Sequence, residues 1–278
     1  MANFSRADSV TLHPVADTGL SAQSPVVNFG TGVDMVIGTQ GPRAGTAKNR
    51  GLIKFDLTGQ IPPSSQIKSV TLTLTVAKAP TMERADSNFE LRRVLRTWNE
   101  SQATWNIRAG VTEFWSSPGA AAPIDFASTI SATQFVGGPA SYTFASTTNL
   151  IADAQAWRDN PGTNFGWIVL TESEEVPETA RRITSREGGA DAPALVIDYT
   201  AGQTQAQPPS LSQLNLLGDT VSFQFNVEPQ RPYTVEFNNE MATNWLTLTN
   251  IAAQPAPTKI TVSDSAAASQ RFYRVKTP

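Results

Sequence analysis

The sequence contains no cysteine and only one histidine, and these shortages exclude several kinds of chemistry. Without cysteine there are no disulfide bonds and no thiolate nucleophile. A Ser-His-Asp triad would have to use His13, which precedes Pro14 in an expected edge strand. No Gly-x-Ser-x-Gly elbow, Walker loop or zinc-ligand spacing occurs in the chain. This shortage of catalytic groups favours a protein that is not an enzyme.

Two catalytic schemes nevertheless stay open. A glycoside hydrolase needs only two carboxylates at a defined separation. A polysaccharide lyase can use a tyrosine together with Arg or Lys, and Tyr142 is the best placed of the four tyrosines for that role. We therefore keep a lyase or a hydrolase as the less favoured alternative.

Charge is scarce and balanced. Charged residues make up 16% of the 278 residues, and 21 basic against 24 acidic side chains give a net charge of −3. So small a net charge creates no long-range field toward nucleic acid or an anionic membrane. No apolar run approaches the length of a transmembrane helix. We expect neither nucleic-acid binding nor membrane insertion, and any recognition by charge must be local.

The first ten residues, MANFSRADSV, lack the basic and apolar regions of a signal peptide. We nevertheless expect a secreted or cell-surface protein, and we interpret Met1-Ala2 as a start that replaces an export signal. The lack of cysteine fits this expectation as well as it fits a cytosolic protein, because many secreted bacterial β-domains also lack cysteine.

Alternation of apolar and polar residues is abundant, and it is typical of antiparallel strands with one face in water. Within residues 1–200 it occurs at 52–57, 67–76, 89–95, 167–171 and 195–199. One helix is expected at 149–158, with Trp157 as a core anchor, and residues 116–146 are expected to form a long loop. The pattern predicts an all-β first domain over residues 1–200.

The polar segment 201–210, which contains two prolines, predicts a linker. Residues 211–278 then carry short strand-like runs at 213–217, 220–227, 233–238, 245–249, 259–262 and 271–276. Turn signals at regular spacing and a lone tryptophan, Trp245, expected in or over the core, favour an immunoglobulin- or fibronectin-III-like sandwich. No site chemistry is visible in this second domain.

The most informative motif is TWNESQATWN, residues 97–106, in which two Trp-Asn pairs flank a carboxylate and lead into Arg108. Indoles stack on the flat faces of sugar rings, and Asn, Glu and Arg match hydroxyls and carboxylates. Trp98 and Trp105 are therefore candidate sugar platforms. The alternative is a packing role, which most tryptophans of β-rich domains have, including a cation–π stack of the two indoles with Arg186.

Five segments, in order, resemble the DNRLRE or disaggregatase-related module, a family that includes alginate-recognising carbohydrate-binding modules. The segments are ADTGL with PVVNFG (16–30), the run from RGLIKFDL to TLTLTV (50–76), RTWNESQATWNIRAG (96–110), IADAQAWRDNPGTNFGWIVL (151–170) and ITSREGGADAPALVIDYT (183–200). The resemblance implies a jelly-roll-type β-sandwich, an extracellular setting and polysaccharide binding. Gly19 and Leu20 depart from it, because such modules usually carry an aromatic or β-branched residue there.

Candidate ligand contacts come mainly from cations on the expected strands. Arg50 and Lys54 share one face of the strand taken from Arg50 to Leu57, and Arg92 and Arg96 share one face of the strand that begins at Phe89. Arginine binds a carboxylate bidentately, so a solvent-facing cationic stripe fits a uronate-containing chain. The alternative is that these cations form ion pairs with Asp56, Glu90, Glu100 or Glu187. The full candidate set is Arg50, Lys54, Arg92, Arg96, Trp98, Trp105, Arg108 and Arg186.

No cofactor is required by this reading. The acidic run Glu172, Glu174, Glu175 and Glu178 is expected to be a solvated loop, with a structural calcium ion as the alternative. Asp17 and Asp198 are suggested as calcium ligands only by their positions near the ends of the first domain, since no Asp-rich loop of calcium-binding spacing is present.

We therefore predict non-catalytic binding of an extracellular, anionic polysaccharide, with retention on an alginate gel lost when Arg50 and Lys54 become alanine. A structural or adhesion protein of the cell surface or matrix is the main alternative. The chain is also expected to be compatible with further domains of a larger secreted protein.

Overall fold

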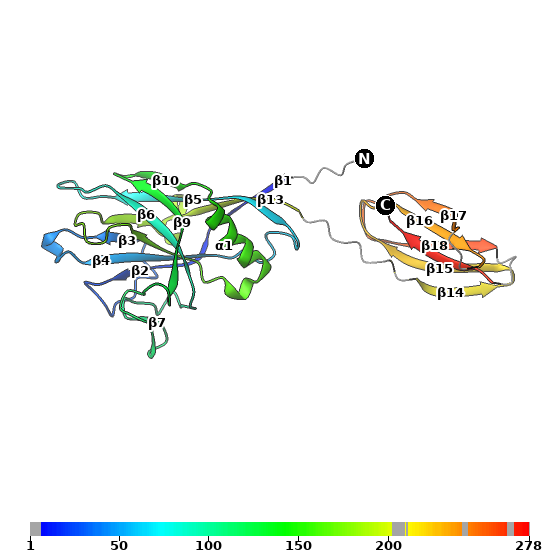
Figure 1. Ribbon diagram of the computed structural model, residues 1–278, viewed down its shortest axis with the longest axis horizontal. Helices are drawn as coiled ribbons and strands as arrows, with labels where there is room; N and C mark the ends of the chain where they lie inside the picture. The colour runs from blue at the N-terminus through cyan, green and yellow to red at the C-terminus, as the bar shows by residue number, and fades with distance from the viewer. Residues whose placement is uncertain (1–6, 202–208, 210, 241–243, 266–269, 278) are drawn as a thin grey trace. The chain divides into compact units, whose positions relative to one another are not determined.

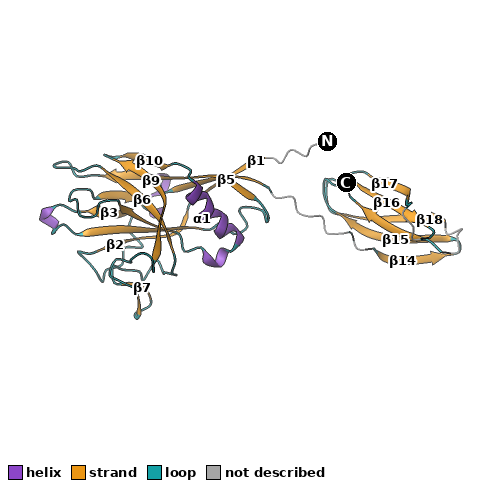
Figure 2. Cartoon of the chain, viewed as in Figure 1, coloured by secondary structure: helices purple, strands orange, loops and turns teal. Residues whose placement is uncertain are grey.

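A computed structural model describes residues 7–201, 209, 211–240, 244–265 and 270–277. The chain divides into two compact units, Met1–Gln203 and Thr204–Pro278 (Figure 1). Most of the predicted linker 201–210, and the interpreted start Met1-Ala2, lie outside the described residues. Nearly all regular structure is strand, as Figure 2 shows, which confirms the all-β prediction.

The first unit is a sandwich of two antiparallel sheets, and successive strands cross between them as in a jelly roll. One sheet runs β1-β13-β5-β12-β3, with β10 on the other side of β5, and the second runs β2-β4-β11-β6-β9. β3 also pairs with β4 through two residue pairs, which joins the sheets at one edge. The strands are β1 (Ala7–Leu12), β2 (Pro14–Ser21), β3 (Asp34–Thr39), β4 (Lys48–Phe55), β5 (Gln66–Lys78), β6 (Ser87–Val94), β9 (Phe126–Val136), β10 (Ala140–Phe144), β11 (Trp167–Thr171), β12 (Arg181–Thr184) and β13 (Ala194–Thr200).

The main core lies between the two sheets. In β5 the apolar residues Val70, Leu72, Leu74 and Val76 point into it, and the intervening threonines remain partly exposed, as the alternation predicts. Three 3-10 helices, η1 (Pro42–Ala44), η2 (Pro161–Thr163) and η3 (Arg186–Asp191), lie in the connections.

The strand β11 shows where the expectation of one wetted face fails. All five of its residues are buried. Trp167 and Val169 pack into the main core, whereas Ile168 and Leu170 pack on the opposite face in a second apolar cluster. A strand buried on both faces reads as a continuous apolar run rather than as an alternating one. The β2-β4-β11-β6-β9 sheet is therefore covered on its outer side as well.

The cover is the segment between β6 and β9, which contains the TWNESQATWN motif and the short strands β7 (Ile107–Ala109) and β8 (Glu113–Phe114). We call this segment, residues 95–125, the flap. The predicted long loop at 116–146 is wrong in its second half, where β9 and β10 form. Their residues are small and weakly alternating, so pairing with β6 and β5 defines these strands more than their own pattern does.

The helix α1 (Thr148–Asp159) confirms the predicted helix within one residue at each end. Thr147 caps it by accepting a hydrogen bond from the backbone N–H of Leu150. Trp157 is fully buried in the main core and lies 4.5 Å from Trp167, ring centre to ring centre. Among the described residues, no helix combines the length and apolarity needed to cross a membrane.

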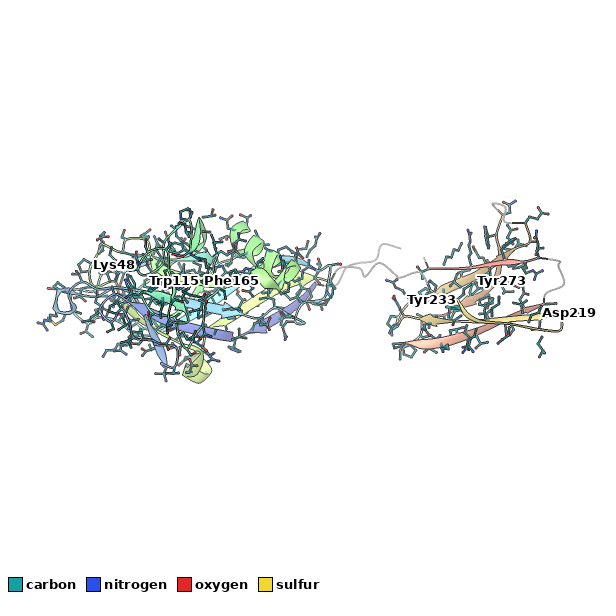
Figure 3. The ribbon with its side chains drawn as sticks, turned by 90° about the horizontal axis from the view of Figure 1, so that it is seen from below. Lys48, Trp115, Phe165, Asp219, Tyr233 and Tyr273 are labelled. Atoms are coloured by element: carbon teal, nitrogen blue, oxygen red, sulfur yellow. The ribbon has the colours of Figure 1, made fainter. Side chains whose placement is uncertain are left out.

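The second unit contains two three-stranded antiparallel sheets, β14-β15-β18 and β17-β16-β19. Its core includes Phe223, Phe225, Tyr233 and Val235, and Figure 3 labels Tyr233 and Tyr273, which lie on the neighbouring strands β16 and β19 of one sheet. Trp245 does not join the buried core but lies beneath the guanidinium of Arg274 at 4.3 Å. The strands are β14 (Ser212–Leu217), β15 (Thr220–Val227), β16 (Tyr233–Asn238), β17 (Leu246–Ile251), β18 (Thr258–Ser265) and β19 (Phe272–Lys276).

Candidate functional site

The flap holds three of the eight predicted site residues, Arg50, Trp98 and Trp105, against the sheet. Trp115 is buried, and Trp98, Trp105 and Phe165 pack around the second apolar cluster, in which Figure 3 labels Trp115 and Phe165. The indole N–H of Trp98 donates to the carbonyl oxygen of Phe165 at 2.8 Å. Both predicted sugar platforms are thus half-buried and pack on this cluster, and their role in binding a sugar stays a prediction.

Arg50 lies under the flap and is fully engaged. Its Nε and Nη2 donate to the two carboxylate oxygens of Glu174, each at 2.6 Å. Its Nη1 donates to the carbonyl oxygens of Gly119 and Ala120, and its guanidinium carbon is 5.6 Å from the centre of the Trp105 ring. Only 13% of the Arg50 side chain is exposed, so the expectation of a solvent-facing stripe at this residue is wrong.

The other predicted cations have mixed surroundings. Arg92 pairs with Glu90 at 2.8 Å, and Arg108 pairs with Glu113 at 2.7 Å within the flap. Arg96 is only loosely held, because its Nη1 is 3.8 Å from the buried Asp125. Lys54 is half-buried on β4, and no ion pair with it is formed within the described chain. The role of these residues in binding a ligand stays a prediction.

The Asp125 carboxylate connects several residues of the flap by hydrogen bonds. This side chain is wholly buried, and it accepts hydrogen bonds from the backbone N–H groups of Ser116 and Ala121 and from the hydroxyl of Ser116. Buried carboxylates are tolerated when hydrogen bonds replace their hydration. The flap therefore has a polar centre of its own besides its apolar underside.

Arg186 stands in a corner where several of the family-like segments meet. Its Nη2 pairs with Glu100 and with Glu187, both at 3.0 Å, so it forms ion pairs instead of the expected cation–π stack. Its backbone N–H donates to Asp17, and the N–H of Asp17 donates to Glu100. Asn28 adds hydrogen bonds from its amide to the carbonyl oxygens of Glu100 and Ala103. These contacts hold the flap to β2 and to the loop before β3.

Burial makes Asp17 a much weaker acid than an ordinary aspartate. Its side chain is 1% exposed, and loss of hydration, with the nearby negative charges of Glu187 and Glu100, raises its pKa from 3.8 to about 7 against the opposing hydrogen bond from the Arg186 N–H. Glu100, Arg186 and Asp17 thus form one coupled structural cluster.

The acidic run after β11 is not simply a solvated loop. Glu174 binds Arg50, and Glu175 binds Lys48. The antiparallel pairing of β11 with β4 aligns the residues after Leu170 with the start of β4, which carries the two cations. The sequence does carry a signal for these ion pairs, because cations begin β4 and glutamates follow β11. This signal can be interpreted only when the pairing of β4 with β11 is known.

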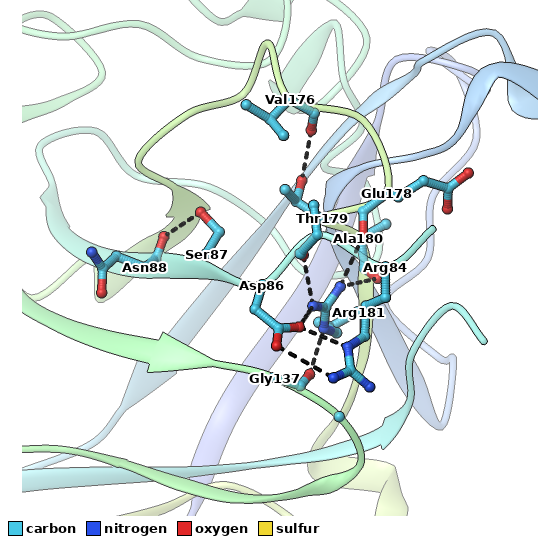
Figure 4. Close-up of polar contacts among 12 residues, drawn as sticks. Arg84, Asp86, Ser87, Asn88, Gly137, Val176, Glu178, Thr179, Ala180 and Arg181 are labelled. Carbon is cyan, nitrogen blue, oxygen red and sulfur yellow. Dashed lines mark hydrogen bonds and ion pairs between the residues drawn. The ribbon is translucent and has the colours of Figure 1, made fainter. Parts of the chain in front are cut away.

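Arg181 organises the connections around the start of β12. This fully buried guanidinium donates to the carbonyl oxygens of Gly137, Glu178, Ala180 and Ala85 and to the carboxylate of Asp86, as drawn in Figure 4. Arg84 binds the same carboxylate at 2.7 Å. Three connections that are distant in sequence are fixed by this one side chain. Sequence analysis did not identify it as structurally important.

Next to Arg181, two cations line one hollow where β12 pairs with the end of β5. The register pairs Arg182 of β12 with Lys78 of β5 at a point where the ladder is irregular, and both residues line a hollow of about 260 Å³. Arg182 is 53% exposed and pairs through Nη1 with Asp34 at 3.1 Å, whereas Lys78 has no ion-pair partner among the described residues. Glu178 also lines this hollow. Like charges directly opposite each other on a sheet are destabilising.

A second hollow, of about 270 Å³, opens between β2 and β3, and we call it the edge cleft. Gly19, Phe29 and Asn49 are part of its lining. Val36, Gln40 and Arg182 line both hollows, so the two are neighbours. None of the residues of this region belonged to the predicted site, because no motif of the sequence brings them together.

The groups considered for catalysis or metal binding have structural contacts. A nitrogen of His13 lies 3.0 Å from the carbonyl oxygen of Pro193. The hydroxyl of Tyr142 accepts from the N–H of Gly137 and donates to the carbonyl oxygen of Gly138. In the described part of the chain, no three His, Cys, Asp or Glu side chains gather where they could hold a metal ion. A structural calcium ion therefore stays a prediction.

Comparison with known proteins gives one assignment. The model of carbohydrate-binding module family 96 matches residues 8–199, which is nearly the whole described first unit. No curated protein matches the chain.

Proposed function

Because the chain belongs to carbohydrate-binding module family 96 through residues 8–199, we propose that its first unit binds an extracellular, anionic polysaccharide without catalysis, with uronate-containing chains favoured. Carbohydrate binding is the property of the family. A preference for an anionic chain, in contrast, has to come from the charged side chains of this particular unit.

The observation that supports an anionic ligand is the pair formed by Lys78 and Arg182. The two residues meet at an irregularity of the β5–β12 ladder and line the same hollow, and like charges held near each other there oppose folding. Such a pair is easier to understand if a bound anion stabilises it. Of the five donors of Arg182, Asp34 engages those on Nη1, so the guanidinium keeps donors for a carboxylate.

The contacts favour this hollow over the predicted stripe on β4. Arg50 has all its nitrogen atoms engaged by Glu174 and by flap carbonyl groups. Removing it would therefore change stability as well as any binding, and the alanine double variant at Arg50 and Lys54 cannot separate the two effects. Lys54 alone can test the stripe.

The experiment is affinity electrophoresis in gels that contain alginate or a neutral glucan, at roughly 0.05 M and roughly 0.5 M salt. We expect retardation by alginate that weakens with salt, and loss of most of it in Lys78→Ala and in Arg182→Ala. Lys54→Ala tests the stripe, and Lys259→Ala, an exposed lysine of the second unit, is the matched control.

Equal retardation by both polymers, insensitive to salt, would exclude the anionic preference and leave only the carbohydrate binding of the family. Loss of retardation in Lys54→Ala with none in Lys78→Ala would return the site to β4. Self-association of the protein with no effect of any glycan would favour the structural or adhesion role. Release of unsaturated, ultraviolet-absorbing product would favour a lyase. We also propose that the protein acts outside the cell, where such polysaccharides occur.

A further inference from the structure

The edge cleft exists because two neighbouring strands do not close on each other. β2 pairs with β4, whereas β3 pairs with β12 and, over two residues only, with β4. The backbones of β2 and β3 still approach, since a Cβ built on Gly19 would be 4.0 Å from the backbone nitrogen of Val36. The hollow of about 270 Å³ lies along this open edge.

Gly19 keeps the cleft open. A Cβ at this position would lie 3.7 Å from the Cβ of Phe29, which is ordinary van der Waals contact, so alanine fits there but a larger side chain would occupy the hollow. Leucine at residue 20 cannot do the same, because Leu20 points to the opposite side, into the cluster under the flap. Of these two residues of β2, only Gly19 thus controls the space in the cleft.

One wall of the cleft is aromatic and exposed. Phe29 is 36% exposed, in contrast to Trp115 and Trp167, which are buried in the two cores of this unit. An exposed ring beside a hollow offers a flat apolar surface on which the C–H face of a sugar ring can stack. A volume near 270 Å³ lies just under the range of about 300 to 1,000 Å³ for small-molecule sites, which suits a single ring of a polymer.

Polar groups complete the lining. The Oε1 atom of Gln40 is buried and has no hydrogen-bond donor in the described part of the protein. An unpaired buried acceptor costs about 1 to 3 kcal/mol. A small rotation of this amide, which no hydrogen bond to Oε1 opposes, would present it to a sugar hydroxyl. Arg182 and Asp34 stand at the same cleft and add charged groups.

We propose that the edge cleft is a second subsite, which holds the sugar ring next to the acidic unit bound over Lys78 and Arg182. This inference rests on the proposed function, because it extends the same site by one ring. Phe29 provides the stacking surface, and Gln40 provides a hydrogen-bonding group. The polysaccharide then crosses β3 at Val36, which lies between the two subsites and is part of both linings.

The test compares an alginate tetrasaccharide with the monosaccharide glucuronate by titration calorimetry on the full chain. Phe29→Ala and Gly19→Leu are expected to weaken tetrasaccharide binding about fivefold to tenfold, an amount in line with loss of one stacked ring. Neither should change glucuronate binding, because that ligand reaches only Lys78 and Arg182. Gly19→Ala and Thr11→Leu, which places a leucine at an exposed position of β1, are the controls and should bind as the unchanged protein does.

Unchanged tetrasaccharide affinity in Phe29→Ala overturns the second subsite, even if Gly19→Leu fails to fold. Equal weakening for both ligands also overturns it, because it would place Phe29 in the acidic subsite. If the unchanged protein binds neither ligand, the failure belongs to the proposed function. Melting curves of each variant separate loss of binding from loss of folding.

Discussion

The backbone N–H of Arg186 donates to the carboxylate of Asp17 at 2.7 Å, across 169 residues of sequence. The bond joins the first of the family-like segments to the last. The side chain of Arg186 extends the connection to Glu100 in the flap. The conspicuous residues of TWNESQATWN and of the Ser185-Arg186-Glu187 run thus serve to attach the flap, while the open surface that we assign to the ligand lies elsewhere.

Asp17 makes the stability of this corner depend on pH. Its pKa in the folded state is about 7, against 3.8 for an ordinary Asp, so the folded protein holds a proton that the unfolded chain releases between these values. Stability contributed by this proton is present below about pH 4 and is lost as the pH rises toward about 7. In Asp17→Asn this loss, with a slope of up to about 1.4 kcal/mol per pH unit, should disappear. Urea unfolding of both proteins from pH 4 to pH 8 measures it, and parallel curves would refute the assignment.

Arg50 and Lys48 lie two residues apart on β4 and differ in the burial of their acidic partners. The side chain of Glu174 is 15% exposed, whereas that of Glu175 is 86% exposed. Arg50→Ala leaves a nearly buried carboxylate and two carbonyl oxygens without a donor, and we expect a loss of about 3 kcal/mol in the free energy of unfolding. Lys48→Ala should cost less than about 1 kcal/mol. Chemical denaturation compares them, and equal losses would show that the flap does not seal the pair.

Gly30 is required by a close approach between the loop before β3 and the flap. A Cβ at Gly30 would be 2.3 Å from the carbonyl oxygen of Glu100. Gly30→Ala should therefore destabilise the protein by about 2 to 3 kcal/mol and displace the flap. Gly59→Ala is the matched control, because Gly59 has a φ of 72° but open space around it, and it should cost about 1 kcal/mol. Thermal unfolding, with tryptophan fluorescence to report on the flap, distinguishes the two, and a Gly30 variant as stable as the control would contradict the contact.

Glu178 opposes an anionic ligand, since its carboxylate lines the same hollow as Lys78 and Arg182. Glu178→Gln keeps the shape of the side chain and removes the charge. We expect stronger retention on alginate at low salt and no change on a neutral glucan. The gain should vanish at high salt. Weaker or unchanged retention on alginate would mean that the anion does not approach this hollow.

Lys78→Ala should separate stability from binding. Removing one of two like charges that face each other should leave the melting temperature equal or slightly higher, although binding of alginate falls. Differential scanning calorimetry beside the gel assay tests this. A fall in both quantities would indicate that Lys78 has a structural role instead.

The strands could be predicted well where their residues alternate or form a continuous apolar run. The strand predicted at 167–171 corresponds to β11 at both ends, and those predicted at 220–227 and 233–238 correspond to β15 and β16. β9 and β10 were missed, since Ala, Ser and Thr dominate them and their pairing with β6 and β5 decides their conformation. Local pattern cannot contain that information.

The candidate site was less accessible to prediction. Alternation correctly placed Arg50 and Lys54 on one face of β4, but it could not show that a segment forty residues later covers that face. The acidic partner of Arg50 is 124 residues away. The pair of Lys78 and Arg182 is also distant in sequence and becomes visible only through the register of β5 and β12. Charge in a strand is informative about function only when its neighbours across the sheet are known.

The first and last strands of the binding unit run side by side in opposite directions, with Ala7 opposite Thr200 and Leu12 opposite Leu195. The polypeptide thus enters and leaves this unit at a single corner. Tension applied to the two ends would separate β1 from β13 one residue pair at a time, because the force acts on the hydrogen bonds in succession and not on all of them together. Under such tension the unit should yield at this seam before its two cores are disturbed.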